Sequence, residues 1–327
     1  MVLNKTLIIS GCLCLTLLGT ACQGNGKQSA GKELKEQADV QRPVGELQFP
    51  FPEIPSMLTE PNDRKAYLLK HYWDDFNFSD TALVNCRDLT EQGFVNYVAL
   101  LAEESTSHAL AEESMAHLCT RMLTDVHASK VMTEMVDAYL YNPNSPYYNE
   151  SLYALFLRPL VESPALDEAR KSRYRFKLEL LERNNPGTQA TAFTYRLADG
   201  TKRTLQQTPV KGNCLLLVFY DPECPSCHET LTEMTGDPFL AEAVARGKVS
   251  VLAVYTEGNE EAWRKALPDM PEGWMVATDR QMVKDHALYD LKAMPSLYLL
   301  DGRKKVILKD APYARIKERL AGEFAGR

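Results

Sequence analysis

The chain has 327 residues and a net charge of −7, with 45% hydrophobic and 25% charged residues. This composition is that of a globular protein with room for two ordinary domains, and it excludes a largely disordered or fibrous chain. The modest negative charge argues against a surface that binds nucleic acid or acidic lipid headgroups.

The N-terminus has the pattern of a bacterial export signal. Lys5 precedes an apolar stretch at residues 7–18 that is too short to span the roughly 30 Å apolar core of a bilayer. The following LGTAC resembles a lipobox, although Gly19 stands where that motif has an apolar residue. We therefore expect residues 1–21 to be a signal peptide and Cys22 to be lipidated, on the periplasmic side of an inner or outer membrane. Secretion without a lipid and an uncleaved anchor remain the alternatives.

Two further segments precede the second half of the chain. Residues 22–46 are polar and contain glycine, which predicts a flexible tether behind the lipid. Residues 47–185 show apolar residues at helical spacing, as in LTEQGFVNYVALLAEES, and the stop signal NNPG ends the pattern. We expect an all-α domain of about six helices here, with Pro159 kinking or ending one of them.

The pattern changes after Gly187. Alternating residues surround the Asp199-Gly200 turn, which predicts a leading β-hairpin. Continuous apolar runs at 214–220 and 249–255 predict strands buried on both faces. Further expected elements are one helical stretch from the cysteine pair to about 246, helices at 260–267 and 281–291, a short strand at 274–278, a hairpin at 294–310 and a closing helix. The order predicts an α/β domain over residues 187–327, with a central mixed sheet flanked by helices.

The stretch DPECPSCHETL contains the strongest chemical signal. Cys224 ends the loop after a buried strand, and Pro225 takes the first helical position, which favours proline. Unpaired N–H groups and the helix dipole at this terminus favour a thiolate on Cys224. Cys227, one turn further, can reach it but is expected to be less exposed. The pair is therefore predicted to be a redox-active dithiol, with Cys224 the nucleophile and Cys227 the resolving thiol.

Other chemistries can use two cysteines at this spacing. With His228 the motif reads CxxCH, which also attaches c-type haem, although a βαβ unit leaves little room for a porphyrin. A zinc site needs a second ligand pair, and no other CxxC or HxxxH occurs. A structural disulfide is the remaining alternative. We expect no cofactor and no metal beyond the redox-active disulfide.

The segment 187–327 resembles the thioredoxin-fold proteins of the membrane-tethered TlpA/ResA kind. The resemblance rests on the hairpin with DG, LLLVFYDPEC running into PSC, LYDLKAMPSLYLLDGRKKVI, and the closing helix. It implies that Pro295 is cis and lies against the redox pair, and that the backbone of Met294 binds an extended substrate. More faintly, NPNSPYYNESLY and its surrounding helices are similar to an uncharacterised domain found ahead of thioredoxin-like modules in Bacteroidetes lipoproteins, to which no chemistry is assigned.

The cysteine motif departs from these relatives at two positions. Glu223 stands where the family has tryptophan, and Val218 stands where thioredoxin has a buried carboxylate that accepts a proton. Asp221, Glu223 and Glu229 place negative charge around Cys224, which opposes thiolate formation and favours a reductase over a strong oxidant. Glu223 and His228 are therefore candidate modulators of the dithiol; a solvated surface position is the other interpretation of His228.

Several remaining residues could have a functional role or only a structural or surface role. Glu233 could serve as an acid or base in place of the missing carboxylate, or lie on the surface. Cys86 and Cys119 could form a disulfide or remain buried thiols, and Cys214 is expected in the core. Four histidines are expected in surface or capping roles: His71, His108, His117 and His127. Five tyrosines are expected to pack or to form a protein-binding surface: Tyr139, Tyr141, Tyr147, Tyr148 and Tyr153.

Taken together, these features predict a membrane-anchored, extracytoplasmic thiol–disulfide oxidoreductase that reduces protein disulfides. Its partners would be protein thiols or disulfides and an electron donor in the membrane or periplasm. The alternative is a lipoprotein whose helical domain binds a partner, with the thioredoxin fold auxiliary. Peroxide reduction fits less well, because Asp221 stands where the peroxiredoxin TxxC motif has threonine. The direction of electron flow, the substrate, the oligomeric state and the role of the helical domain stay open.

Overall fold

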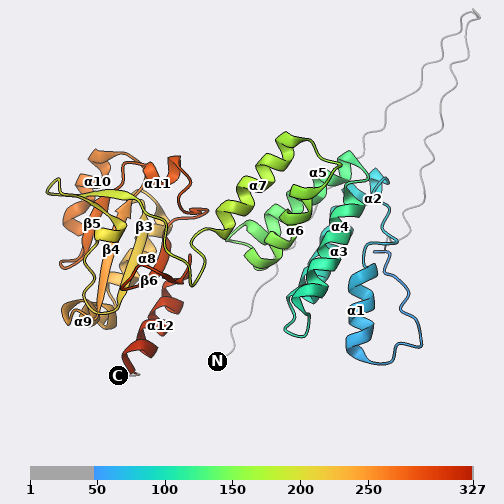
Figure 1. Cartoon of the computed structure of the whole chain (residues 1–327), viewed down its shortest axis with the longest axis horizontal. Coiled ribbons are helices and arrows are strands. Elements are labelled where there is room, and N and C mark those ends of the chain that lie inside the picture. Colours follow the sequence, from blue (N-terminus) through green and yellow to red (C-terminus); the bar gives the residue numbers. More distant parts are fainter. Residues whose placement is uncertain (1–47, 326–327) are drawn as a thin grey trace, which may run out of the picture. The chain divides into compact units, whose positions relative to one another are not determined.

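The computed structural model describes residues 48–325, which form a helical part followed by an α/β part (Figure 1). The predicted signal peptide, the predicted lipidation site Cys22 and the predicted tether lie outside the described residues. Within residues 48–325, no helix is both long enough and apolar enough to cross a membrane.

The helical part confirms the prediction of an all-α domain. Its elements are α1 (Pro61–His71), α2 (Thr81–Asn85), α3 (Arg87–Ala102), α4 (His108–Met122), α5 (Val126–Val136), a π-helical turn η1 (Asp137–Tyr141), α6 (Glu150–Glu162) and α7 (Glu168–Glu182). Side-chain caps begin five of them, since an Asp, Ser or Asn oxygen accepts a free N–H of the first turn: Asp80, Ser107, Asp125, Asn149 and Asp167. Pro159 does not end its helix, because α6 continues to Glu162.

Aromatic packing organises the start of the helical core. Tyr72, Trp73 and Tyr97 are fully buried and lie in ring contact with one another. Phe49 packs on Tyr72 and Trp73 and occupies the space above Gly93, where any Cβ would overlap its ring. The Tyr72 hydroxyl donates to the Gly93 carbonyl at 2.7 Å. The segment before α1 is therefore part of the core and no longer belongs to a tether.

A mixed seven-stranded sheet forms the centre of the second part, in the order β2-β1-β5-β4-β3-β6-β7. Its strands are β1 (Thr194–Leu197), β2 (Lys202–Thr204), β3 (Cys214–Tyr220), β4 (Val249–Tyr255), β5 (Met275–Thr278), β6 (Ser296–Asp301) and β7 (Val306–Leu308). Strand β3 pairs in parallel with β4 and antiparallel with β6. Every residue of β3 and β4 is buried, as their continuous apolar runs predict.

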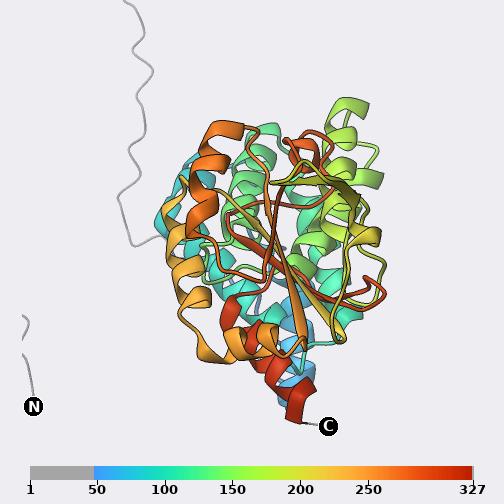
Figure 2. The same ribbon diagram turned by 90° about the vertical axis from the view of Figure 1, so that its left-hand side faces the viewer.

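Helices and loops cover both faces of this sheet (Figure 2). The helices are α8 (Pro225–Thr235), α9 (Pro238–Ala245), α10 (Glu260–Ala266), α11 (Met282–Asp285) and α12 (Tyr313–Ala325). Side chains of α8, α9, α10 and α12 bury one face. The other face is buried by Phe193, the β1–β2 hairpin, Val283 and Tyr289.

Two expected helices differ in the structure. The stretch from the cysteine pair to about 246 is two helices, because Gly236 ends α8 and Pro238 begins α9. The helix expected at 281–291 is only α11, since Gln281 and Ala287 take left-handed φ values of 70° and 47°. Residues beyond it leave the helix so that Tyr289 can pack in the core of the sheet, where it is 2% exposed. Tertiary burial thus overrides the local helical pattern.

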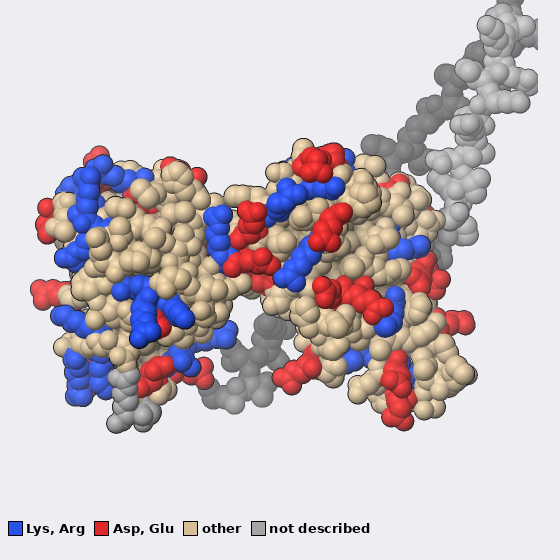
Figure 3. All heavy atoms as spheres, viewed as in Figure 1, with Lys and Arg blue, Asp and Glu red and all other residues tan. Residues whose placement is uncertain are grey.

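Charged side chains of both signs are intermixed on the face of the molecule seen in Figure 3. Many of the closest ion pairs lie within single helices at i,i+4 spacing, such as Arg264–Glu260 and Arg319–Glu323, both at 2.8 Å. Exposed pairs of this kind contribute little to stability, about 0.3–0.5 kcal/mol each.

Candidate functional site

The cysteine motif lies at the junction between β3 and α8. Asp221 shapes the loop: its carbonyl accepts from the Cys224 N–H at 3.2 Å, and its Oδ1 accepts from the Glu223 N–H at 3.0 Å. Cys224 takes an extended conformation as the N-cap of α8, and Pro225 begins the helix, as the sequence predicts. The sulfur of Cys224 therefore stands at a helix N-terminus, where backbone N–H groups are unpaired.

The two sulfurs have different environments. Cys224 is half-buried, whereas Cys227 is fully buried beneath the loop, and neither forms a disulfide. Burial raises the pKa of the Cys227 thiol to about 12, although the Asp221 N–H, which donates to Cys227 Sγ at 3.3 Å, opposes the change. Cys227 is thus held as a thiol at neutral pH, and Cys224 is the sulfur that a partner can reach. This confirms the expectation that Cys227 is the less exposed of the pair.

The segment before β6 completes the site. The Met294–Pro295 peptide bond is cis, as the resemblance implies. The Met294 carbonyl oxygen lies 3.8 Å from Cys224 Sγ and accepts from it, so this backbone faces the accessible sulfur across 70 residues of sequence. Met294 and Pro295 are half-buried. The structure therefore brings together four of the predicted site residues: Cys224, Cys227, Met294 and Pro295.

The candidate modulators lie outside this group. The side chains of Glu223, His228 and Glu233 are exposed. Within residues 48–325 none of them forms a side-chain hydrogen bond to either sulfur. Val218 is fully buried in the middle of β3, between Ala253 of β4 and Leu297 of β6.

Val218 replaces the buried carboxylate that accepts a proton in thioredoxin, and Asp221 is an acidic residue whose charge acts on Cys227 in this structure. It borders the buried thiol through its own backbone, and its charge adds to the rise of the Cys227 pKa. The sequence Asp-Pro-Glu is typical of a turn in which the Asp side chain accepts from the N–H two residues later. This pattern would have predicted the hydrogen bond from the Glu223 N–H to Asp221 Oδ1.

The remaining thiols lie apart from the site. Cys86 and Cys119 are not joined in a disulfide, and the buried Cys119 Sγ donates to the Phe156 carbonyl at 3.5 Å. Burial raises the pKa of Cys119. Cys214 is 2% exposed at the start of β3, a core position as expected.

The histidines of the helical part form local contacts. His71 Nδ1 and His117 Nε2 lie 2.7 Å and 2.6 Å from the two carboxylate oxygens of Asp74. Burial acts to raise the Asp74 pKa, but the two imidazoles outweigh it and the pKa is lowered. In the described part of the chain, no group of three or more His, Cys, Asp or Glu side chains is arranged to hold a metal ion.

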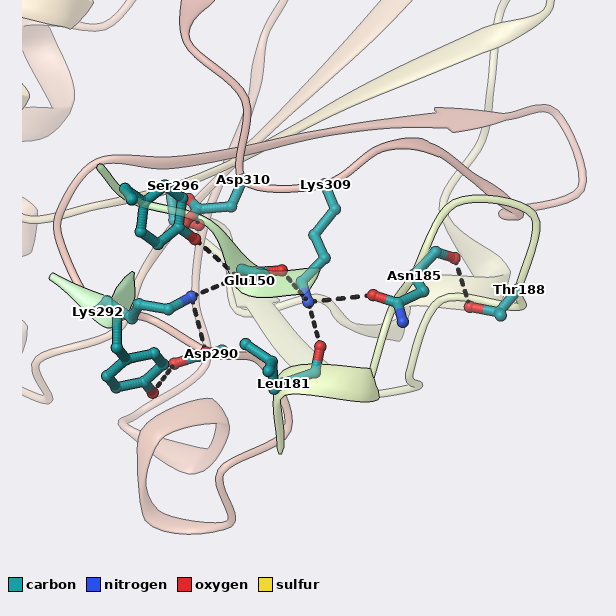
Figure 4. A network of polar contacts seen from close by, with 11 residues as sticks. Glu150, Leu181, Asn185, Thr188, Asp290, Lys292, Ser296, Lys309 and Asp310 are labelled. Carbon is teal, nitrogen blue, oxygen red and sulfur yellow. Dashed lines mark hydrogen bonds and ion pairs between the residues drawn. The ribbon is translucent and has the colours of Figure 1, made fainter. Parts of the chain in front are cut away.

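Sequence reasoning missed a polar network that reaches the segment before Pro295 (Figure 4). Glu150, the first residue of α6, lies 2.7 Å from the Lys292 Nζ and 3.0 Å from the Lys309 Nζ. Tyr141 and Tyr148, from the tyrosine-rich turn before α6, stand over Lys292 with its Nζ 5.1 and 5.5 Å from their ring centres. Two of the five clustered tyrosines therefore contact the α/β part directly, which no local pattern in the sequence indicates.

Both the helical part and the α/β part of the chain are similar to known proteins. Residues 21–184, half of the chain, match a family model described as a domain of unknown function (DUF5106). A thioredoxin-like protein from Bacteroides caccae is 37% identical, covers 84% of this chain and 98% of its own, and superposes with a TM-score of 0.72. A search of curated proteins gives no match.

Two further structures align with less than half of the chain. One is the C-terminal domain of an uncharacterised protein from Bacteroides fragilis, 37% identical over 42% of this chain and 98% of its own, with a TM-score of 0.41. The other is a domain of a possible thiol-disulfide isomerase from Cytophaga hutchinsonii, 25% identical over 44% and 97%, with a TM-score of 0.38. The long match to the Bacteroides caccae protein spans both the helical and the α/β part. The chain therefore belongs to the DUF5106 family and is a thioredoxin-like protein, whose α/β part follows its helical domain.

Proposed function

We propose that this protein is an extracytoplasmic thiol–disulfide oxidoreductase that reduces disulfides in other proteins through Cys224 and Cys227. The observation that carries the proposal is the asymmetry of the two sulfurs at one helix terminus. Cys224 is accessible at the N-cap of α8, and Cys227 is fully buried one turn away. A structural staple would need no accessible sulfur, and covalent attachment of haem would need both sulfurs at the surface of a pocket.

The exchange reaction follows from this asymmetry. The Cys224 thiolate attacks one sulfur of a substrate disulfide, which breaks the S–S bond, forms a mixed disulfide and releases one substrate thiolate. Cys227 then loses its proton and attacks Cys224 Sγ, which closes the Cys224–Cys227 disulfide and releases the second substrate thiol. Two electrons pass to the substrate, and a dithiol donor must return them. The carbonyl of Met294 beside Cys224 gives an extended substrate a backbone hydrogen-bond partner next to the reacting sulfur.

The direction of electron flow is proposed from the charges at the site. Strong oxidants stabilise the thiolate of their reduced form, which makes the dithiol the favoured state. Here burial holds Cys227 as a thiol and the charge of Asp221 raises its pKa further, while Glu223 directly precedes Cys224 in the sequence. These features favour the disulfide relative to a thiolate pair, as in a reductant.

The proposal includes a lipid anchor at Cys22, which the sequence pattern of residues 1–22 supports. In cells that express the full chain, a Cys22→Ala variant is expected to leave the membrane fraction. A wild-type chain found only in soluble fractions would contradict the anchor and leave the redox proposal untouched.

The redox proposal is tested by the reduction potential of the Cys224/Cys227 pair in the mature chain, together with turnover of insulin disulfides. We expect a potential near or below about −250 mV; a value near −120 mV would identify an oxidant instead. Cys224→Ser is expected to abolish turnover, and Cys227→Ser to accumulate the mixed disulfide. Cys86→Ser, which alters a thiol away from the site, is the matched control. A pair that does not titrate as a dithiol would refute the proposal.

A further inference from the structure

The segment that faces Cys224 is held by side chains. In the described chain, residues 289–295 form no backbone–backbone hydrogen bond with any other residue. The helix that the sequence pattern predicts here ends at Asp285, and β6 begins only at Ser296. The position of the Met294 carbonyl beside Cys224 therefore depends on anchors to either side of it.

Lys292 is the anchor before Met294. Its side chain is 3% exposed, and its Nζ lies 2.7 Å from Glu150 Oε1 and 2.8 Å from Asp290 Oδ2. The Tyr141 hydroxyl donates to Asp290 at 3.0 Å, and the Tyr148 hydroxyl donates to Glu150 at 2.8 Å. A buried ammonium group enclosed by two carboxylates and two aromatic rings has one well-defined position, because each departure leaves a buried charge without its partner.

A second anchor lies directly after Pro295. The Ser296 hydroxyl donates to Asp310 Oδ1 at 2.6 Å. Lys309 directly precedes Asp310 in the sequence. Its side chain is 5% exposed, and its Nζ lies 3.0 Å from Glu150 Oε2. Its Nζ also donates to the Leu181 carbonyl at the end of α7. Figure 4 shows Lys292 and Lys309 reaching Glu150 from opposite sides.

Glu150 is suited to hold both lysines. It is the first residue of α6, where the helix dipole and the unpaired N–H groups favour a negative charge. Burial acts to raise the pKa of its carboxyl, but Lys292 and Lys309 outweigh this and lower the pKa, so the group is ionised at neutral pH. One carboxylate oxygen serves each lysine. A single residue of the helical domain therefore links the chain before β6 to the chain after β7.

We propose that Glu150 is a positioning residue for thiol–disulfide exchange: through Lys292 and Lys309, the DUF5106 helical domain holds the Asp290–Ser296 segment so that the Met294 backbone faces Cys224 and receives a polypeptide substrate. This inference rests on the proposed function of the dithiol and assigns a role to the helical domain. It implies that the helical domain determines how well extended substrates dock, while the sulfur chemistry itself resides in the α/β domain.

The test uses two disulfides of different size with the full mature chain. Insulin is a polypeptide that can pair with the Met294 backbone, whereas the small aromatic disulfide DTNB needs only the sulfur of Cys224. In Glu150→Gln, which keeps the shape of the side chain and removes its charge, we expect kcat/KM for insulin to fall about tenfold or more, mainly through KM. The rate with DTNB is expected to stay within about twofold of wild type, since the sulfurs are unaltered.

The matched control is Glu182→Gln. Glu182 pairs with Arg158 at 2.8 Å within the helical part and is half exposed, so the same chemical change there leaves the segment before β6 intact. Lys292→Met is expected to reproduce part or all of the loss, and the double variant Glu150→Gln/Lys292→Met to lose no more than Glu150→Gln alone, because the Glu150–Lys292 contact is already weakened in that variant.

The outcomes separate the two proposals. Unchanged insulin turnover in Glu150→Gln, or an equal loss with insulin and DTNB accompanied by a lower melting temperature, would overturn the positioning role and leave the redox function standing. Activity with insulin and DTNB that survives Cys224→Ser would instead overturn the redox function.

Discussion

The buried resolving cysteine makes the stability of the reduced protein depend on pH in a defined window. Burial raises the pKa of Cys227 from 9.0 to about 12 in the folded chain. Unfolding exposes this thiol, which then ionises near its ordinary value, so the unfolded chain binds fewer protons above that pH. The contribution of Cys227 to stability is therefore fully present below pH 9 and is lost as the pH rises toward 12. One proton corresponds to about 1.4 kcal/mol per pH unit in that window, and about 4 kcal/mol over all of it.

The measurement is a urea titration of the reduced chain, in the presence of a phosphine reductant, compared with the same titration of Cys227→Ala. Other groups, such as Cys119 and the buried tyrosines, titrate in both proteins and cancel in the difference. Between about pH 8 and about pH 10.5, the stability advantage of wild type over the variant should shrink by about 2 kcal/mol. A difference that stays constant within about 0.5 kcal/mol would show that Cys227 is not buried as a thiol, and the asymmetry on which the exchange mechanism depends would be wrong.

Three further substitutions test the packing around the site and in the helical domain, each by urea denaturation with unchanged secondary structure as the control. Tyr141→Phe removes the donor to the buried Asp290 carboxylate and should cost about 1–3 kcal/mol; no loss would mean that water replaces the hydroxyl. Gly93→Ala should destabilise by about 1–3 kcal/mol despite the better helix propensity of alanine, because its Cβ overlaps the Phe49 ring, and a gain in stability would contradict that contact. Asp237→Ala removes the N-cap of α9 and should cost about 1 kcal/mol or more, whereas a neutral effect would exclude the cap.

The two domains have separable tasks in this view. The α/β domain supplies an accessible sulfur at a helix N-terminus and a buried partner beneath it, and under the proposed function we expect this pair to suffice for exchange with small disulfides. The helical domain supplies Glu150, which pairs with Lys292 of the segment that we propose as the docking site of a polypeptide substrate. The pairing of these domains in one chain then has a physical reason, because residues 289–295 form no backbone–backbone hydrogen bond with any other described residue.

Much of the fold follows from local sequence signals. The continuous apolar runs at 214–220 and 249–255 coincide with β3 and β4, since strands buried on both faces need apolar residues at every position. The Asp199-Gly200 turn and Pro225 also lie where expected, because their backbone preferences act within a few residues. The helix expected at 281–291 fails for the opposite reason: burial of Tyr289 against the sheet outweighs the helical pattern.

The sequence by itself predicted the dithiol site of this protein, since the CPSC motif and its helix-starting proline are recognisable from residue types and spacing, and the family resemblance added the distant Met294-Pro295 pair. It could not assign Glu150, Lys292 and Lys309, because charged residues in a sequence are most often solvated, and nothing local marks the few that become buried. Glu150 and Lys292 lie 142 residues apart, and only the tertiary contact between the first residue of α6 and the segment before β6 brings them within 2.7 Å. The tertiary structure thus decided how the helical domain meets the segment beside Cys224, because burial and pairing of charges depend on contacts between distant segments.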